Sequence, residues 1–505
     1  MRSILAWPVG VVLASLVLAS LAAQADHGPP PAKPKRIKGA ESFPPLPLPA
    51  TPLRRTERKR DPTPPVLIGK VKYGKPRAWV QPDGSTYMMY DWESEKGDIP
   101  SLLRRFGKAT GVRYHWIAQD IHTFSGDPDE VPILYFTGHG ELGLTPQELS
   151  RLRDYVLRGG FVFGNACHGM AAFATAFRAE MAKIFPNRPF RPLPPDHPLF
   201  CSVFPIDTVG YSKEALASIA KGEIKCGERQ PYFEGIDLGC RTAILLSPFD
   251  LSCGWNGVKH TNCRGVAHSD ANRLGVNMLA YMLAYHDLGK FLSTTTVYYE
   301  NDEPARGAFT FGQIRHGGDW DTDPSAPGNL LKAVASLTSG RVKFQRRTID
   351  PERDLSRVPF LYISGHYDFE LSDKAVTNLR SFLARGGFLL ANSCCGRAAF
   401  DAAFRREIAR VVPGGLKSLS PDHPVFSCHF RITKVGYTPL VLRENPGLES
   451  PVMEGITVDG QLRVLYSPFD LGNGWERVDH PFTRGVAEKD AFRIAINSII
   501  YAMTH

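Results

Sequence analysis

The sequence predicts an α/β protein built from two tandem, doubly wound parallel-sheet domains, and two observations lead to this prediction. The first is a set of short, continuous apolar runs such as Val131–Thr137, which are typical of strands covered on both faces. The second is that helical patterns lie between these runs, and the order strand, helix, strand, helix indicates parallel strands. This order occurs twice along the 505-residue chain.

Local signals place the next elements of the first half. Thr145-Pro146-Gln147-Glu148 supplies an N-cap, a proline at the first helical position and a capping-box glutamate, so we expect a helix from here to about Leu157. Gly159-Gly160 ends this helix, and Phe161–Ala166 is expected to be the next buried strand.

A turn and two further helices complete the first half. Cys167-His168-Gly169 forms the turn after the second strand, and a helix is expected over Ala171–Phe185. A terminal helix closes each half, over Asp270–Ala284 in the first and Asp490–Met503 in the second.

Repeated motifs show that the two halves arose by duplication. The matching segments are Val131–His139 and Val358–His366, Arg158–Phe161 and Arg385–Phe388, Pro195–Pro198 and Pro421–Pro424, Ser247–Leu251 and Ser467–Leu471, Gly254-Trp255 and Gly474-Trp475, and Arg264–Ala267 and Arg484–Ala487. Because this unit is far longer than a solenoid repeat, we interpret it as a duplicated domain. Glu300–Pro304 breaks any regular element and marks the boundary between the copies.

We therefore expect four segments. They are a signal peptide or N-terminal anchor (1–25), a disordered, Pro-rich, basic tether (26–65), a first domain (66–290) and a second domain (305–505). Val9–Leu21 is the apolar core of a secretory signal, and Ala23-Gln24-Ala25 fits its cleavage site. The alternative is an uncleaved anchor, because Ile4–Ala23 is just long enough to span a bilayer. Either way we expect an exported protein, periplasmic, extracellular or anchored with its body outside the cytoplasm.

Net charge argues against nucleic acid as a partner. The chain carries +9, but nine Lys and Arg against four Asp and Glu lie in residues 26–65, so the domains are nearly neutral. The basic tether either associates with an anionic envelope surface or serves as a solvated spacer.

Cysteine usage fits an oxidising compartment. The chain has nine cysteines, an odd number, so at least one thiol is free or pairs between chains. Four of them cluster in the first half, and one or two local disulfides are expected there with the pairing open: Cys226, Cys240, Cys253 and Cys263.

Chemistry is expected beyond the carboxyl ends of the strands, where doubly wound sheets bind ligands. His139 follows one strand and Cys167 the next, so a right-handed crossover brings them to one sheet edge, roughly 5–10 Å apart. Cys167 also begins a helix, where the macrodipole favours the thiolate. This is the physical setting of a nucleophile elbow.

The stretch Asn165–Gly169 resembles the Cys elbow of the class I glutamine amidotransferase-like superfamily, which has a flavodoxin-like fold. More closely, both halves resemble the bacterial domain-of-unknown-function 4159 family within that superfamily, from Gly317-Gly318-Asp319-Trp320 through the repeated motifs to Gly-Trp. The resemblance implies the fold and leaves the activity open, since the family has none assigned. Acidic residues commonly precede the Cys in the family, but Asn165-Ala166 and Asn392-Ser393 stand there in this chain.

Two further departures weaken a catalytic interpretation. The second half has Cys394-Cys395-Gly396, so its elbow lacks the adjacent histidine, and Tyr90-Asp91-Trp92 lacks the Gly-Gly that precedes Asp319. We take Cys167 with His168 or His197 as the catalytic candidates, a thiol nucleophile and its base. The alternative is that Cys167 is a small buried residue at a tight turn.

The other candidates are ligand-binding residues near the strand ends. They are His139, Asp196, Asp250, Trp255, His366, Cys394, Asp422, His423, Asp470 and Trp475. The two aspartates of Ser-Pro-Phe-Asp-Leu bind a polar ligand or cap a turn. The two tryptophans stack on a sugar ring or belong to the core.

A metal site would draw on the same residues, namely His139, His168, His197 and Asp196 with His366, His423 and Asp422. No HxxxH or HxH spacing supports it, so we expect neither a metal nor a cofactor. The function expected first is an envelope binding or scaffolding module for a small-molecule, glycan or protein ligand. The alternative is a Cys-dependent hydrolase acting through the first domain.

Overall fold

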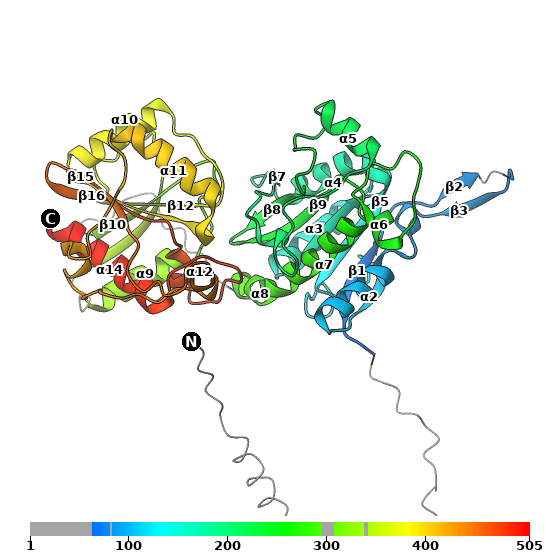
Figure 1. The fold of residues 1–505 in the computed structure, drawn as a ribbon, viewed down its shortest axis with the longest axis horizontal. Helices are drawn as coiled ribbons and strands as arrows, with labels where there is room; N and C mark the ends of the chain where they lie inside the picture. The colour runs from blue at the N-terminus through cyan, green and yellow to red at the C-terminus, as the bar shows by residue number, and fades with distance from the viewer. Residues whose placement is uncertain (1–62, 81–82, 295–307, 338–341) are drawn as a thin grey trace, which may run out of the picture. The chain divides into compact units, whose positions relative to one another are not determined.

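The computed structural model describes residues 63–80, 83–294, 308–337 and 342–505. Residues 63–505 form one compact unit that contains two seven-stranded sheets (Figure 1). We call β1 to α8 (66–294) the first repeat and β10 to α14 (308–504) the second repeat. The expected signal peptide and nearly all of the expected tether lie outside the described residues, as does the expected break at Glu300–Pro304.

The sheet of the first repeat has the order β4-β1-β5-β6-β9-β8-β7. These strands are β1 (Val66–Lys72), β4 (His115–Asp120), β5 (Ile133–Gly138), β6 (Phe161–Ala166), β7 (Arg191–Pro192), β8 (Glu234–Leu238) and β9 (Arg241–Ser247). The five strands from β4 to β9 are parallel, whereas β8 and β7 are added antiparallel.

The sheet of the second repeat has the matching order β11-β10-β12-β13-β16-β15-β14. Its strands are β10 (Ala308–Ile314), β11 (Lys343–Ile349), β12 (Phe360–Gly365), β13 (Phe388–Ser393), β14 (Lys417–Ser418), β15 (Glu454–Val458) and β16 (Gln461–Ser467). The same strand directions recur. The predicted fold class, two tandem doubly wound α/β domains, is confirmed.

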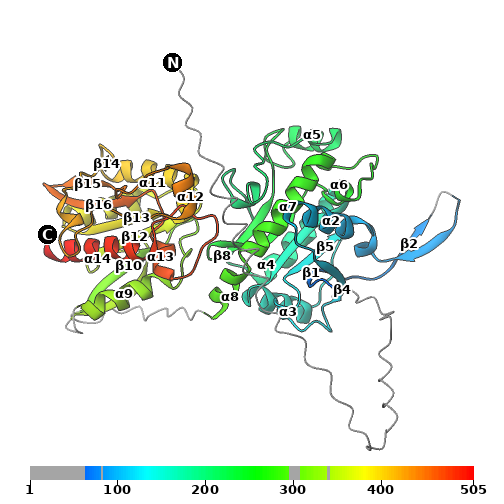
Figure 2. The same cartoon turned by 60° about the horizontal axis from the view of Figure 1, so that its bottom comes forward.

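Helices cover both faces of each sheet (Figures 1 and 2). In the first repeat they are α2 (Asp98–Thr110), α3 (Pro146–Leu157), α4 (Ala171–Ile184), α5 (Lys213–Ala220), α6 (Ser252–Asn256), α7 (His268–Ala284) and α8 (His286–Thr294). Side chains of α2, α6 and α7 share a core with Tyr135 and Phe163, while α3 and α4 pack against Leu134 and Val162. Successive strand residues thus enter opposite cores, as the pleat requires.

The second repeat follows the same plan. Its helices are α9 (Ala326–Leu337), α10 (Asp373–Ala384), α11 (Ala398–Val411), α12 (Pro439–Glu444), α13 (Gly472–Glu476) and α14 (Glu488–Thr504). Here α9, α13 and α14 share one core with Tyr362 and Leu390, and α10 and α11 share the other with Leu361 and Leu389.

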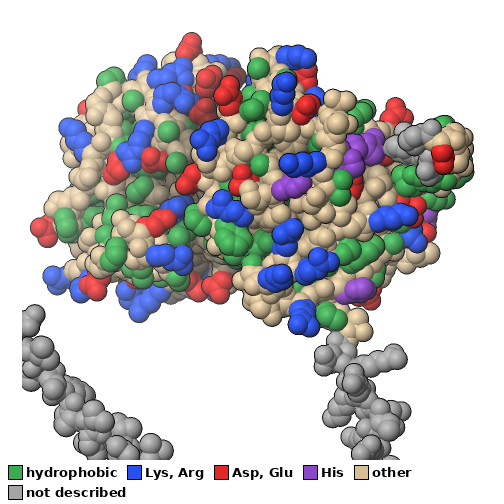
Figure 3. Space-filling model, turned by 45° about the vertical axis from the view of Figure 1, so that its right-hand side comes forward, with side chains coloured by type: hydrophobic (Ala, Val, Ile, Leu, Met, Phe, Trp, Pro, Cys, Tyr) green, Lys and Arg blue, Asp and Glu red, His purple; other side chains and the backbone are tan. Residues whose placement is uncertain are grey.

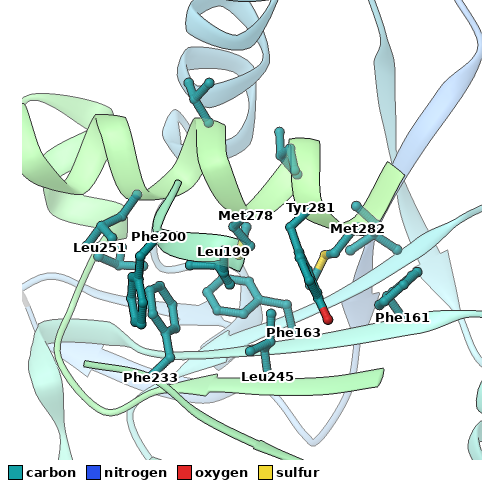
Figure 4. Packing of buried hydrophobic residues seen from close by; sticks show 14 of the residues in the cluster. Phe161, Phe163, Leu199, Phe200, Phe233, Leu245, Leu251, Met278, Tyr281 and Met282 are labelled. Atoms are coloured by element: carbon teal, nitrogen blue, oxygen red, sulfur yellow. The ribbon is translucent and has the colours of Figure 1, made fainter. Parts of the chain in front are cut away.

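The predicted local signals are confirmed around the first elbow. The Thr145 hydroxyl accepts a hydrogen bond from the Glu148 backbone, and the Glu148 carboxylate accepts one from the Thr145 backbone, which completes the capping box of α3. Strand β6 spans Phe161–Ala166 as expected, and α4 ends one residue earlier than expected, at Ile184. Helix α7 packs on the opposite face of the sheet from α3 and α4, where Met278, Tyr281 and Met282 lie over Phe163 and Leu245 (Figure 4).

Two features of the first repeat were not expected. A hairpin of β2 (Arg77–Val80) and β3 (Thr86–Met89) precedes the first site residues, and α8 continues past Lys290, where we placed the domain end. Among the described residues, no helix is both long and apolar enough to cross a membrane. Lys and Arg are interspersed with Asp and Glu on the face shown in Figure 3.

Candidate functional site

Each repeat gathers histidine, cysteine and carboxylate side chains beyond the carboxyl ends of its parallel strands. The first site consists of Asp91, Glu95, His139, Cys167, His168 and His260. The second site consists of Asp319, Asp323, His366, Cys394, Cys395 and His480, joined by Cys240 of the first repeat. The two sets occupy matching sequence positions, so the duplication has kept a shared arrangement of side chains.

An aspartate–histidine pair anchors each site. Asp91 lies in the short 3-10 helix η1 (Asp91–Glu93), and its carboxylate is 2.7 Å from Nδ1 of His139. The same carboxylate accepts hydrogen bonds from the backbone of His139 and Gly140. Burial opposes the charge on Asp91, but the His139 contacts prevail and hold the pKa of that carboxyl below its usual value. In the second site, Asp319 lies 2.9 Å from Nδ1 of His366.

The glycine before His139 is required by this close approach. A Cβ added at Gly138 would lie 2.0 Å from the Tyr73 hydroxyl and 2.6 Å from the Asp91 carboxylate. The Gly-His motif therefore makes room for the residues that orient the imidazole.

The elbow turns are fixed by a buried aspartate in each repeat. The turns are η2 (Cys167–Gly169) and η4 (Cys394–Gly396), and their middle residues have left-handed backbone with φ of 52°. Asp250 accepts a hydrogen bond from the backbone of His168, and Asp470 accepts one from that of Cys395. Each aspartate also accepts a hydrogen bond from the backbone of the first residue of the short helix that follows it, Ser252 of α6 and Gly472 of α13.

The thiol of Cys167 is buried in the first site. Burial and the nearby Asp250 charge raise its pKa well above that of an ordinary cysteine, and its only described hydrogen bond joins it to the Ser94 hydroxyl at 3.7 Å. At neutral pH this side chain is therefore a thiol, and the expected effect of the helix dipole is outweighed.

The imidazoles of the first site contact one another, with His139 and His168 edge to face and His168 and His260 tilted. The ring centroids of His139 and His168 lie 5.1 Å apart, and those of His168 and His260 lie 4.5 Å apart. Oε1 of Glu95 is 3.4 Å from Nε2 of His260 and 3.9 Å from Nε2 of His168. Burial and the neighbouring His139 lower the pKa of His168, so this ring is neutral at pH 7. The side chains of His168 and His260 keep 31% and 35% of their surface exposed.

The second site is closed and richer in sulfur. Cys240 belongs to the turn between β8 and β9 of the first repeat, and its Sγ lies 3.3 Å from Sγ of Cys394. Sγ of Cys395 lies 4.0 Å from that of Cys394. Asp323 accepts from both Cys240 and Cys394, and all of these side chains are buried.

Charge is concentrated on one sulfur of this cluster. The neighbouring Cys240 and Cys394 thiols, with His366 and His480, hold the pKa of Cys395 well below its usual value despite burial. Burial opposes protonation of His366, but Asp319 and Cys395 raise the pKa of its imidazole to about 10. Cys395 is thus the thiolate of the second site.

His197 and His423 cap short helices. Nδ1 of His197 accepts from the Leu199 backbone at the start of η3 (Pro198–Phe200), and Nδ1 of His423 accepts from Val425 at the start of η5 (Pro424–Phe426). Nε2 of His197 bonds to Thr242, and no hydrogen bond among the described residues joins it to Cys167.

The remaining candidates lie elsewhere. Asp196 caps the start of α11 through the Ala398 backbone, and its carbonyl accepts from Arg397. Asp422 is exposed. Trp255 and Trp475 are fully buried and donate to the carbonyls of Ala271 and Ala491, so no ring face is open to a sugar.

The expected local disulfides are absent, since all nine cysteines lie in the described residues and all are free thiols. Of the four clustered cysteines, Cys240 is directed to the second repeat instead. Cys253 and Cys263 lie with their sulfurs 4.0 Å apart beside Asp250. Cysteines that are close in the sequence therefore lie at two separate places in the structure.

Sequence reasoning missed the acidic and histidine partners. The signal was the repetition of Asp-Trp-x-x-acid, as Asp91 with Glu95 and Asp319 with Asp323, and of Trp-x-x-x-x-His, ending in His260 and His480. It also missed Cys240 as a site residue, because the second repeat has Gly460 in the matching turn.

The fold and these sites define a class: tandem α/β proteins with His, Cys and carboxylate groups gathered at the ends of parallel strands. A family model described as a domain of unknown function (DUF4159) matches residues 68–283 and again residues 310–503. The chain therefore belongs to this family and carries two tandem copies of its domain, as the sequence motifs predicted. No curated protein matches the chain.

Proposed function

We propose that the protein is an exported, envelope-facing binding module that holds a transition metal ion of the zinc type at its first site. The fold supports membership of the class I glutamine amidotransferase-like superfamily, with the strand-end crevice used for binding. The metal would recruit a polar small-molecule, glycan or protein ligand by taking one of its donor atoms.

The ligand set of the first site carries this proposal. Donor atoms of Glu95, His168 and His260 lie within 4.8 Å of one another and of the sulfur of Cys253, which adjoins the site, and those of His139, Cys167 and His168 form an overlapping group. Imidazole and carboxylate ligands suit zinc, and a neutral imidazole is the form that binds it. Nε2 of His168 is buried without a hydrogen-bond partner, so a cation would satisfy it.

The carboxylate behind His139 also fits a metal site. Metal-bound histidines commonly donate their other ring nitrogen to a carboxylate, which orients the ring. The contact between Nδ1 of His139 and Asp91 has this form. Partial exposure of His168 and His260 leaves the site open to a further ligand, as in zinc sites that exchange ligands.

The alternative, a Cys-dependent hydrolase acting through Cys167, has less support. Such a nucleophile needs a thiolate and a base within hydrogen-bond reach. Cys167 is held as a thiol, and the expected base His197 is bonded to Thr242.

Zinc titration by isothermal calorimetry tests the proposal. The full chain should bind zinc at the first site, and Glu95→Gln together with His260→Ala should weaken that binding by at least tenfold. His115→Ala, which removes an exposed histidine of β4, is the matched control. Binding unchanged in the Glu95 and His260 variants, or a folded chain that takes up no metal, would refute the proposal.

A further inference from the structure

We propose that the second site is a structural zinc site shared by the two repeats, with Cys240, His366, Cys394 and Cys395 as its four ligands. It uses none of the first-site residues and does not depend on the proposed function. A Cys₃His set is typical of structural zinc, which is bound by closed, four-coordinate sites.

The ligand atoms already lie at the right separations. They are all within 4.8 Å of one another, and the four residues are buried. Zinc–sulfur bonds of about 2.3 Å in a tetrahedron place two sulfurs about 3.8 Å apart. The sulfur of Cys394 lies 3.3 Å from that of Cys240 and 4.0 Å from that of Cys395, which brackets this value.

Consecutive cysteines reach one centre because the backbone reverses between them. On a continuing strand, neighbouring side chains would point to opposite faces of the sheet. The left-handed conformation of Cys395, held by the Asp470 carboxylate, ends that alternation directly after β13.

The histidine ligand provides an independent observation. Nε2 of His366 is buried beside the Cys395 sulfur and has no nitrogen or oxygen partner in the described structure, while Nδ1 is fixed by Asp319. This is the arrangement of a metal-bound imidazole with a carboxylate behind it. Asp319 is in turn held by Arg188 of the first repeat at 3.0 Å.

Comparison of the repeats explains why this site is closed and the first is open. The β8–β9 turn of the first repeat supplies Cys240 to the second site, whereas the matching β15–β16 turn has Asp459-Gly460, which offers no sulfur. The second repeat also has Cys395 where the first has His168. The second site therefore has more sulfur ligands than the first and is covered by the other repeat. Zinc bound there would link the two repeats.

The neighbouring groups support a cation at this point. Asp323 contacts the Cys240 and Cys394 sulfurs. His480 is buried beside them and near the Cys395 sulfur, with no nitrogen or oxygen partner at Nδ1 in the described structure and with Nε2 bonded to Glu476. Zinc would be balanced by thiolates at the ligand positions, with Asp323 and His480 as outer groups.

Cobalt substitution of the full chain is the decisive experiment. Chain purified under reducing conditions, stripped of metal and loaded with Co²⁺, should show the thiolate-to-cobalt charge-transfer absorption of a tetrahedral, sulfur-rich site. Cys240→Ser should lose at least half of this absorption and one equivalent of zinc, measured by elemental analysis. Cys428→Ser, which alters a half-buried thiol bonded to the backbone, should lose neither.

The first-site variant Glu95→Gln, His260→Ala separates the two proposals, since it should keep the cobalt–thiolate absorption that Cys240→Ser removes. If Cys240→Ser fails to fold, the spectrum of the Glu95→Gln, His260→Ala variant, in which the first site is disabled, still decides. Absence of charge-transfer absorption, or a Cys240–Cys394 disulfide found by mass spectrometry in exported protein, would overturn the structural zinc site.

Discussion

The Sγ atoms of Cys240 and Cys394 lie 3.3 Å apart although 154 positions separate the two residues in the sequence. The contact joins a hairpin turn of the first repeat to the strand-end crevice of the second. The duplicated sites therefore differ in surroundings: the second is covered by the first repeat, whereas His168 and His260 in the first remain partly exposed.

Cysteine labelling distinguishes a binding module from a hydrolase. Burial raises the pKa of both thiols, but more strongly for Cys167, and Cys201 is exposed whereas Cys167 is buried, so iodoacetamide should label Cys201 much faster at pH 8. Mass spectrometry of peptides from protein labelled in its native state measures both rates. Preferential labelling of Cys167 well below pH 8 would instead restore the hydrolase interpretation.

The capping box of α3 makes a measurable contribution to stability. Thr145→Ala removes the hydroxyl that accepts from the Glu148 backbone and should lower the free energy of unfolding by about 1 kcal/mol. Urea denaturation followed by circular dichroism gives the value. Thr123→Ala, at an exposed position outside the helices, should change it by less than about 0.5 kcal/mol. Equal effects of the two changes would contradict the capping assignment.

The space beside the Gly-His motif can be tested with one methyl group. Gly138→Ala would push against Tyr73 and Asp91 and displace the carboxylate from His139. Loss of the carboxylate that orients a metal-binding histidine should weaken zinc binding at the first site about 10–100-fold, as measured by calorimetry. Gly328→Ala is the control, because its added Cβ meets nothing within 4 Å. Unchanged zinc affinity in Gly138→Ala would argue against the orienting role of Asp91.

Acid should destabilise the second repeat through His316. Burial lowers the pKa of this imidazole to about 4 and outweighs its hydrogen bond to the Ser364 carbonyl, which favours the protonated ring. The neutral ring also accepts a hydrogen bond from the Gly318 backbone at Nδ1. The unfolded chain binds the proton near pH 6.5, so this stability is complete above that pH and is lost as pH falls toward 4.

The loss of stability in acid can be calculated from the lowered pKa of His316. Between pH 7.5 and 5, His316 should account for about 1–2 kcal/mol of lost unfolding free energy. In His316→Gln, the decline measured by urea denaturation should be smaller by that amount. A decline as steep as in the unaltered chain would show that His316 does not titrate in this range.

Local signals predicted the centre of each repeat well. Thr145 and Glu148 placed α3, and the apolar run of Phe161–Ala166 placed β6 to the residue, because caps and buried runs act over a few residues. The antiparallel additions β7 and β8 were not predicted. Two-residue strands such as β7 carry no periodicity, and their direction depends on the sheet they join.

The candidate sites divide in the same way. His139 and Cys167 were expected at one sheet edge, and their ligand atoms lie within 4.8 Å in a group with His168. His197 was assigned to the same chemistry, but its ring bonds to Thr242 and caps a short helix. The sequence does not show how far His197 lies from Cys167, because that distance depends on how the chain between them folds.

The sequence by itself determined the duplication, the alternation of buried strands and helices, and the elbow positions of Cys167 and Cys394, since all depend on local pattern or direct repetition. Only the tertiary structure decided that Cys240 leaves its sequence cluster for the second repeat, and that the second site is closed while the first is open. Contact between the repeats determines both features. It brings together residues that are far apart along the chain, and no local sequence pattern indicates that they meet.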